Sequence, residues 1–133
     1  MKTASLTALF FGLILASCQT APAPIPADAT PEIYFQRAQA ASDMNQYDEA
    51  LALYKSFLTQ HPDATHEDVF SARYEIGLLL LKKGQHTQAQ ADFETILADF
   101  ENLDKSAGAP GWVKVLTAKK LQEIKDQAPE AKG

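Results

Sequence analysis

Apolar residues recur at helical spacing in two separate segments of the chain, Tyr34 to Asp63 and Arg73 to Asn102. Within each segment they follow the spacing i, i+3, i+4, i+7, i+8, or nearly so, which is typical of one face of an amphipathic helix. These positions are Ala50, Leu53, Tyr54, Phe57 and Leu58 in the first segment, and Ala89, Phe93, Ile96, Leu97 and Phe100 in the second.

The two segments align with an offset of 39 residues, which places Ala50 opposite Ala89. Each contains a short polar break, "DMNQ" at residues 43–46 and "KKGQ" at residues 82–85. Gly84 is a natural helix stop, and Pro62 ends the first segment because proline cannot continue a helix interior. Each segment is therefore predicted to be a helix–turn–helix unit, with residues 63–68 in the linker between them.

Small residues stand at equivalent places in the two first helices, Ala38 and Gly77, where they let two helices approach closely. Together with the alanine pair Ala50 and Ala89 and the aromatic pair Tyr54 and Phe93, this pattern resembles the tetratricopeptide repeat, a helix–turn–helix of about 34 residues. The resemblance implies an all-α array of helical hairpins. A plain helical hairpin bundle is the alternative.

One more helix is expected after a loop at residues 101–110. It runs from Trp112 to Ala128 and is closed by Pro129. A stacked array exposes apolar surface at its end unless something covers it. We interpret this helix as a C-terminal capping helix on two repeats, which gives a helical domain at residues 32–128 and a disordered tail at 129–133. Its apolar half is formed by Trp112, Val113, Leu116, Leu121 and Ile124.

The N-terminus has the pattern of a signal peptide at residues 1–17. Lys2 is followed by the apolar run "LTALFFGLILA", which is shorter than the roughly 20 residues that a membrane-spanning helix needs. Leu15 to Cys18, "LASC", resembles the lipobox of bacterial lipoproteins, which implies cleavage before Cys18 and lipidation of its thiol. A secreted protein with a chance cysteine is the alternative.

The resemblance also suggests a location. Lipoproteins retained at the inner membrane often carry aspartate after the lipidated cysteine, whereas this chain has Gln19. We therefore expect a lipid anchor in the bacterial outer membrane facing the periplasm, ahead of the inner membrane or the cell surface. Residues 18–31 contain four prolines and are expected to form an extended tether.

The composition and the absence of known catalytic motifs limit the classes of function that the chain can have. With 133 residues and a net charge of −5, the chain has room for one domain and lacks the basic surface of a nucleic-acid-binding protein. The three histidines do not have the spacing of metal ligands, and no serine–histidine–acid set or glycine-rich phosphate loop is present. We expect no catalytic site, metal or cofactor.

Tetratricopeptide arrays usually bind partners on the concave face formed by the first helix of each repeat. By register, the resemblance marks a candidate groove in both repeats. One alternative is that the C-terminal helix fills it; the other is that a short groove stays open for a peptide. The marked residues are Phe35, Gln39, Ser42 and Asp43 in the first repeat, and Tyr74, Leu78, Leu81 and Lys82 in the second.

Small repeat-bearing lipoproteins resemble two groups, the components of outer-membrane protein assembly and the Tol-Pal-associated coordinators of envelope constriction. The former carry about five repeats, more than this chain, so neither role is assigned. The sequence favours an envelope adaptor that binds another protein or a peptide. The alternative is a small accessory subunit of an envelope assembly, secretion or enzyme complex.

Overall fold

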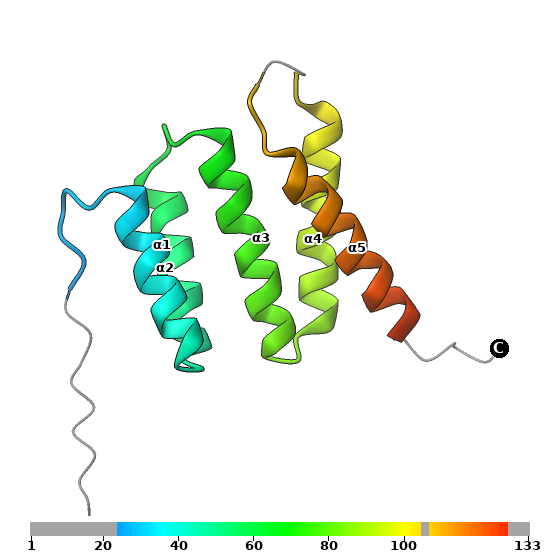
Figure 1. The fold of residues 1–133 in the computed structure, drawn as a ribbon, viewed down its shortest axis with the longest axis horizontal. Coiled ribbons are helices and arrows are strands. Elements are labelled where there is room, and N and C mark those ends of the chain that lie inside the picture. The colour runs from blue at the N-terminus through cyan, green and yellow to red at the C-terminus, as the bar shows by residue number, and fades with distance from the viewer. Residues whose placement is uncertain (1–23, 105–106, 128–133) are drawn as a thin grey trace, which may run out of the picture.

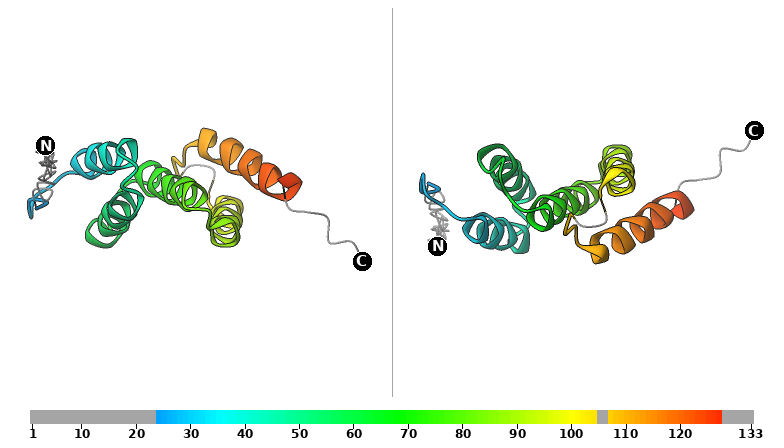
Figure 2. Two further views of the ribbon diagram at one scale, coloured as in Figure 1. Left: turned by 90° about the horizontal axis from the view of Figure 1, so that it is seen from below. Right: turned by 90° about the horizontal axis from the view of Figure 1, so that it is seen from above.

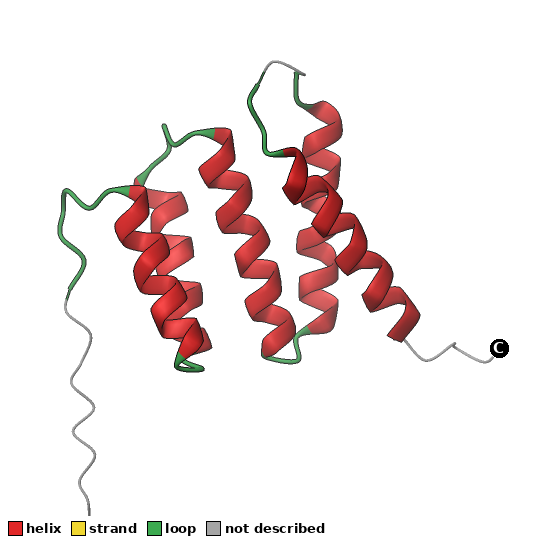
Figure 3. Ribbon diagram, in the orientation of Figure 1, coloured by secondary structure: helices red, strands yellow, loops and turns green. Residues whose placement is uncertain are grey.

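The computed structural model describes residues 24–104 and 107–127, which contain five α-helices and no strand (Figure 3). The helices run alternately down and up in the view of Figure 1, so that consecutive helices are antiparallel. The predicted all-α array of two hairpins and a final helix is confirmed. Its elements are α1 (Pro31–Asp43), α2 (Tyr47–Gln60), α3 (His66–Lys82), α4 (His86–Asn102) and α5 (Gly111–Gln127).

Helix α3 lies in the middle of the array. Figure 2 shows α1 and α5 on one side of α3, and α2 and α4 on the opposite side, in both of its views. Helix α3 thus lies between the pair α1 and α5 and the pair α2 and α4. One face of α3 is therefore turned toward α1 and α5, and the opposite face toward α2 and α4.

The turns inside the two hairpins have the same geometry. Asn45 and Gly84 stand 39 residues apart and both adopt a left-handed backbone, with φ of 59° and 73°. After each, a backbone N–H reaches back to a helix carbonyl, from Gln46 to Ala41 and from Gln85 to Leu80, both at 2.9 Å. Glycine and asparagine are the residues that tolerate this conformation best. The predicted turns at "DMNQ" and "KKGQ" are confirmed.

The second hairpin begins earlier than predicted. Residues 63–68 were expected to be linker, but α3 starts at His66 because Thr65 caps it. The Thr65 Oγ1 accepts a hydrogen bond from the Asp68 N–H at 3.1 Å and donates one to the Asp68 carboxylate at 2.7 Å. The Thr65 side chain thus satisfies one of the N–H groups that have no partner within the helix at its start. The linker prediction is wrong from His66 onward.

The close approach expected at the small residues is present. Ala38 is completely buried, and Gly77 faces the ring of Phe93, which is also completely buried. A Cβ placed on Gly77 would lie 2.6 Å from Phe93 Cζ, far inside van der Waals contact. Glycine is therefore required for α3 and α4 to pack at this separation.

Helix α5 packs mainly against α4 and covers the end of the array. The residues that face the array are Val113, Thr117, Leu121 and Ile124, all buried. Two residues of the predicted apolar half lie outside this stripe, since Trp112 is 47% exposed and Leu116 is 39% exposed. These two residues of the apolar half are therefore left partly in solvent, because α5 has neighbours on one side alone within the described residues.

The chain just before α1 lies against the helical domain. Ala29 is buried, Ile25 packs against the core, and Pro31 is already the first residue of α1. Proline fits at a helix start because its missing N–H would have no partner there. The last part of the predicted tether, residues 25–31, therefore belongs to the folded domain.

Several predictions concern residues outside the described ranges: the signal peptide at 1–17, lipidation at Cys18, and the tail at 129–133. Within residues 24–104 and 107–127, none of the helices combines the length and apolarity that a membrane span requires.

Candidate functional site

A groove lies on the side of α3 that faces α1 and α5 (Figure 2). Its volume is about 630 Å³, within the range of small-molecule and peptide-anchor pockets. Four helices contribute to it: α1 and α5 form the two sides, α3 forms the floor, and α2 adds one aromatic side chain. We call this surface the front groove; it is lined by Phe35, Gln36, Gln39, Ala40, Asp43, Tyr54, Ser71, Glu75 and Trp112.

Aromatic rings define the apolar part of the front groove. Phe35 meets Tyr54 edge to face, with ring centroids 5.3 Å apart, and meets Phe57 at the same distance. Trp112 stands on the opposite side, where its ring contacts Tyr74 edge to face at 5.9 Å. Such pairs hold aromatic side chains in fixed orientations. The groove is therefore bordered by aromatic surface from both α1 and α5.

The polar part of the front groove is acidic. Burial raises the pKa of the Glu75 carboxyl, and the positive charge of Lys82 partly opposes this shift. Burial, and then the charge of Glu75, raise the pKa of the Tyr54 hydroxyl, which stays protonated at neutral pH. Asp43 accepts a hydrogen bond from Gln39 Nε2 at 2.8 Å. Two carboxylates and several neutral polar groups thus line the groove.

The eight residues marked by the sequence have different surroundings. Phe35, Gln39 and Asp43 line the front groove. Ser42 is buried and accepts a hydrogen bond from Lys82 Nζ at 2.9 Å. Lys82 is exposed overall, and its Nζ lies 5.6 Å from the centre of the Tyr47 ring.

The remaining three marked residues are Tyr74, Leu78 and Leu81. Tyr74 is buried, and its ring contacts both Phe93 and Trp112. Leu78 and Leu81 are half-buried against the core and follow Tyr74 at helical spacing, so they share its side of α3. Helix α5 therefore covers part of the predicted surface, while the part next to α1 stays open.

Six lining residues were not marked by the sequence: Gln36, Ala40, Tyr54, Ser71, Glu75 and Trp112. A signal existed for Glu75, because it is the one acid between Asp68 and the end of a helix rich in leucine. Trp112 was placed on the apolar half of the last helix. Tyr54 was placed on the apolar face of its helix, and its small exposed fraction agrees with that position.

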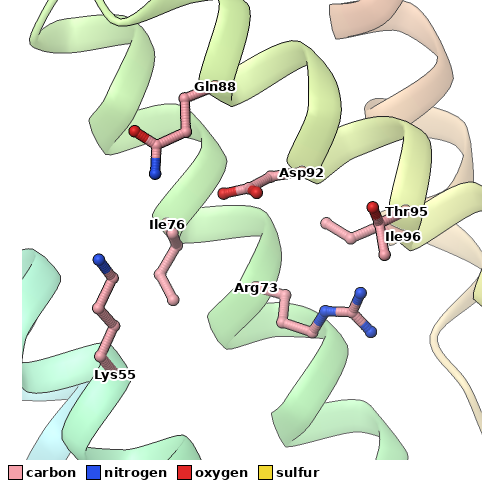
Figure 4. Close-up of a pocket in the computed structure, with 7 residues that line it drawn as sticks. All are labelled: Lys55, Arg73, Ile76, Gln88, Asp92, Thr95 and Ile96. Carbon is pink, nitrogen blue, oxygen red and sulfur yellow. The ribbon is translucent and has the colours of Figure 1, made fainter.

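A second, smaller recess lies on the opposite face, between α2 and α4 over α3 (Figure 4). Its volume is about 290 Å³. Figure 4 shows Lys55 entering from α2, Asp92 from α4, and Ile76 on the floor. Burial raises the pKa of Asp92, and the positive charges of Lys55 and Arg73 oppose that shift. We call it the back pocket; Arg73, Gln88, Thr95 and Ile96 complete its lining.

Each cation of the back pocket has a carboxylate near it. Arg73 Nη1 donates to Asp99 Oδ2 at 2.7 Å, and its guanidinium also lies over the Phe70 ring. Lys55 stands opposite Asp92 across the pocket (Figure 4). The cations of this pocket therefore interact with Asp92 in its lining and with Asp99 outside it. In the described ranges, no group of three or more His, Cys, Asp or Glu side chains is arranged to hold a metal ion.

Comparison with known proteins agrees with this architecture. The family model of the tetratricopeptide repeat matches residues 35–101, just over half of the 133 residues and nearly the whole of α1 to α4. Comparisons with curated proteins and with solved structures gave no significant match. The two matched hairpins share their turn geometry and their small residue in the first helix. The chain therefore belongs to the tetratricopeptide repeat family.

Proposed function

We propose that the chain is a lipid-anchored adaptor of the bacterial cell envelope, which faces the periplasm from the outer membrane and binds a protein partner in the front groove. Tetratricopeptide repeats generally mediate protein–protein interactions and are typically non-catalytic, which supports binding over catalysis. The resemblance of "LASC" at residues 15–18 to a lipobox supports the anchor and the envelope location.

The observation that carries the binding function is the open front groove between α1 and α5. A volume of about 630 Å³ accommodates a few side chains of a partner. Phe35 and Trp112 present aromatic surface to such side chains, and aromatic residues are the ones that most often dominate binding energy at interfaces. A short extended or helical segment that inserts apolar anchors is therefore the partner that fits this site.

A bulky residue placed inside the groove tests this function. Gln39 and Gln122 make a matched pair, because each is exposed on a helix and each donates to an aspartate four residues later at 2.8 Å. Gln39 lines the front groove, whereas Gln122 is not part of it. We expect Gln39→Trp to block partner binding and Gln122→Trp to leave it intact.

The measurement is crosslinking in cells followed by mass spectrometry, with the unmodified chain and both variants. A partner that is crosslinked to the unmodified chain and to Gln122→Trp, but lost with Gln39→Trp, supports the groove as the binding site. Equal recovery of every crosslinked protein with all three chains refutes it.

The anchor is tested separately at Cys18, the single cysteine of the chain. Lipid chains add about 0.8 kcal/mol of membrane affinity for each buried methylene, and two or more chains are needed for stable anchoring. We expect Cys18→Ser to move the protein from the membrane fraction to the soluble fraction. A protein that remains with the membrane after this change contradicts the lipid anchor.

A further inference from the structure

The front groove has acids in its lining but no cation. Glu75 stands on its floor and Asp43 at its α1 side, while none of the nine lining residues is lysine, arginine or histidine. The back pocket differs, because Lys55 and Arg73 there stand near Asp92. The charge of the front groove is thus uncompensated within its own lining.

The uncompensated negative charge of the front groove is centred on Glu75. Its side chain is half-buried, and among the described residues it makes no hydrogen bond or ion pair. Lys82 acts on the Glu75 carboxyl at a distance, but its Nζ is held by Ser42 and lies over the Tyr47 ring. Burying a carboxylate without a hydrogen-bonded partner is unfavourable. A partner that supplied a cation would remove this cost.

The rest of the groove suits the stem of such a cation. Lysine and arginine carry long apolar stems that pack along apolar surface while the charged group reaches a polar partner. Phe35 and Trp112 offer that surface, and tryptophan is the aromatic residue with the strongest attraction for cations. A bare metal ion would leave most of the 630 Å³ empty.

We infer that the front groove recognises a protein segment whose anchoring residue is a lysine or an arginine, with its stem between Phe35 and Trp112 and its charge at Glu75. This inference rests on the proposed binding function and specifies the chemistry of the partner. Asp43 and the net charge of −5 favour approach of the same basic segment.

The test uses the full chain in mild detergent and a randomised peptide library displayed on phage. Selected peptides are then synthesised, together with a copy in which the basic residue is replaced by norleucine, and their affinities are measured. Glu75→Gln removes the charge at nearly constant shape. Glu101→Gln is the matched control, because it removes one exposed acid of α4 outside the groove.

The inference predicts that selected peptides share a lysine or arginine and that Gln39→Trp prevents their binding. Hydrogen bonds to charged groups are among the stronger ones, so Glu75→Gln should weaken the basic peptide by about tenfold. The norleucine peptide should bind Glu75→Gln and the unmodified chain equally, and Glu101→Gln should change neither affinity.

Two other outcomes would contradict the basic anchor, and they differ in whether the proposed binding function also fails. If peptides bind in the groove but show no basic residue, or bind Glu75→Gln as tightly as the unmodified chain, the basic anchor is wrong and the binding function stands. If no selected peptide is blocked by Gln39→Trp, both the basic anchor and the proposed function of the groove are wrong.

Discussion

Replacement of Gly77 by alanine is the sharpest test of the packing between α3 and α4. The added Cβ would lie 2.6 Å from Phe93 Cζ and 3.0 Å from Cδ1, whereas carbon atoms in contact prefer about 3.5–4.0 Å. Phe93 has no exposed surface and is packed against Tyr74, so its ring has no free space to enter. The methyl group therefore forces either the ring or the two helices apart.

The expected change in the free energy of unfolding for Gly77→Ala follows from two opposing effects. Overpacking a well-filled core costs about 1–3 kcal/mol. Alanine is more favourable than glycine inside a helix by about 0.5–1 kcal/mol. The net expectation is a loss of about 1–2 kcal/mol in the free energy of unfolding. A domain of this size then loses about 5–10 °C in Tm.

The assay is chemical and thermal unfolding followed by far-ultraviolet circular dichroism, with Ala38→Gly as the control. Ala38 holds the equivalent place in the first hairpin, where a Cβ is already present and buried. Ala38→Gly should cost about 1.5 kcal/mol, because glycine is unfavourable in a helix and a buried methyl is lost.

A second variant tests whether the Phe93 ring causes the loss of stability in Gly77→Ala. Phe93→Leu shortens the side chain and should itself destabilise the domain, because it leaves a cavity. In the double variant the alanine methyl enters that cavity, so we expect it to be at least about 1 kcal/mol more stable than the sum of the single changes implies. Additive effects, or a stabilising Gly77→Ala, would refute the argument that Gly77 is required by the Phe93 ring.

Three further predictions concern stability and binding. Burial raises the pKa of Glu75 in the folded chain, so the folded chain holds this proton more tightly than the unfolded chain and loses stability as the pH rises above about 4.5. Glu75→Gln should therefore have a higher Tm than the unmodified chain at neutral pH, and the two should converge near pH 4 in thermal unfolding. Thr117→Val should raise the free energy of unfolding by about 1 kcal/mol in urea titrations, because the buried Thr117 hydroxyl has no partner among the described residues. Trp112→Ala should lower stability by about 1 kcal/mol, the value of one aromatic contact, and abolish peptide binding in the groove by isothermal titration calorimetry.

The repeat architecture could be predicted because its signals are local. Asn45 and Gly84 mark the turns, and Ala38 and Gly77 mark the close helix contact, at the same offset of 39 residues. Asparagine and glycine tolerate the left-handed turn, and a small residue permits the close helix contact. Their agreement in two copies left little freedom for another arrangement of α1 to α4.

The surface of α5 could not be predicted in the same way. Periodicity shows which residues share a face, but it does not show how much of that face a neighbour covers. Trp112 and Leu116 lie at the margin of the buried stripe, since α5 packs mainly on α4 and leaves that margin in solvent. Helices α1 and α3 each have a following helix against which the corresponding margin is packed.

The open groove and the residues marked on α3 differ by one position for a related reason. Tyr74 and Phe35 are equivalent in register, and both were marked. In the structure, Trp112 of α5 covers Tyr74, so the open surface of α3 is centred on the next residue, Glu75. One residue corresponds to a rotation of about 100° around a helix. The position of a helix distant in sequence thus decides which side chain faces the groove.

Glu75 is expected to oppose folding and to support binding. A residue kept for packing contributes to both in the same direction, because its loss loosens the site along with the fold. For Glu75 the effects on stability and on binding have opposite signs. Glu75→Gln should raise Tm at neutral pH and, in the same sample, weaken the binding of a basic peptide. Local conflicts of this kind are expected at functional sites, since an unpaired, half-buried charge has value there once a ligand supplies its partner. A variant that lost both stability and affinity would instead identify Glu75 as a structural residue of α3.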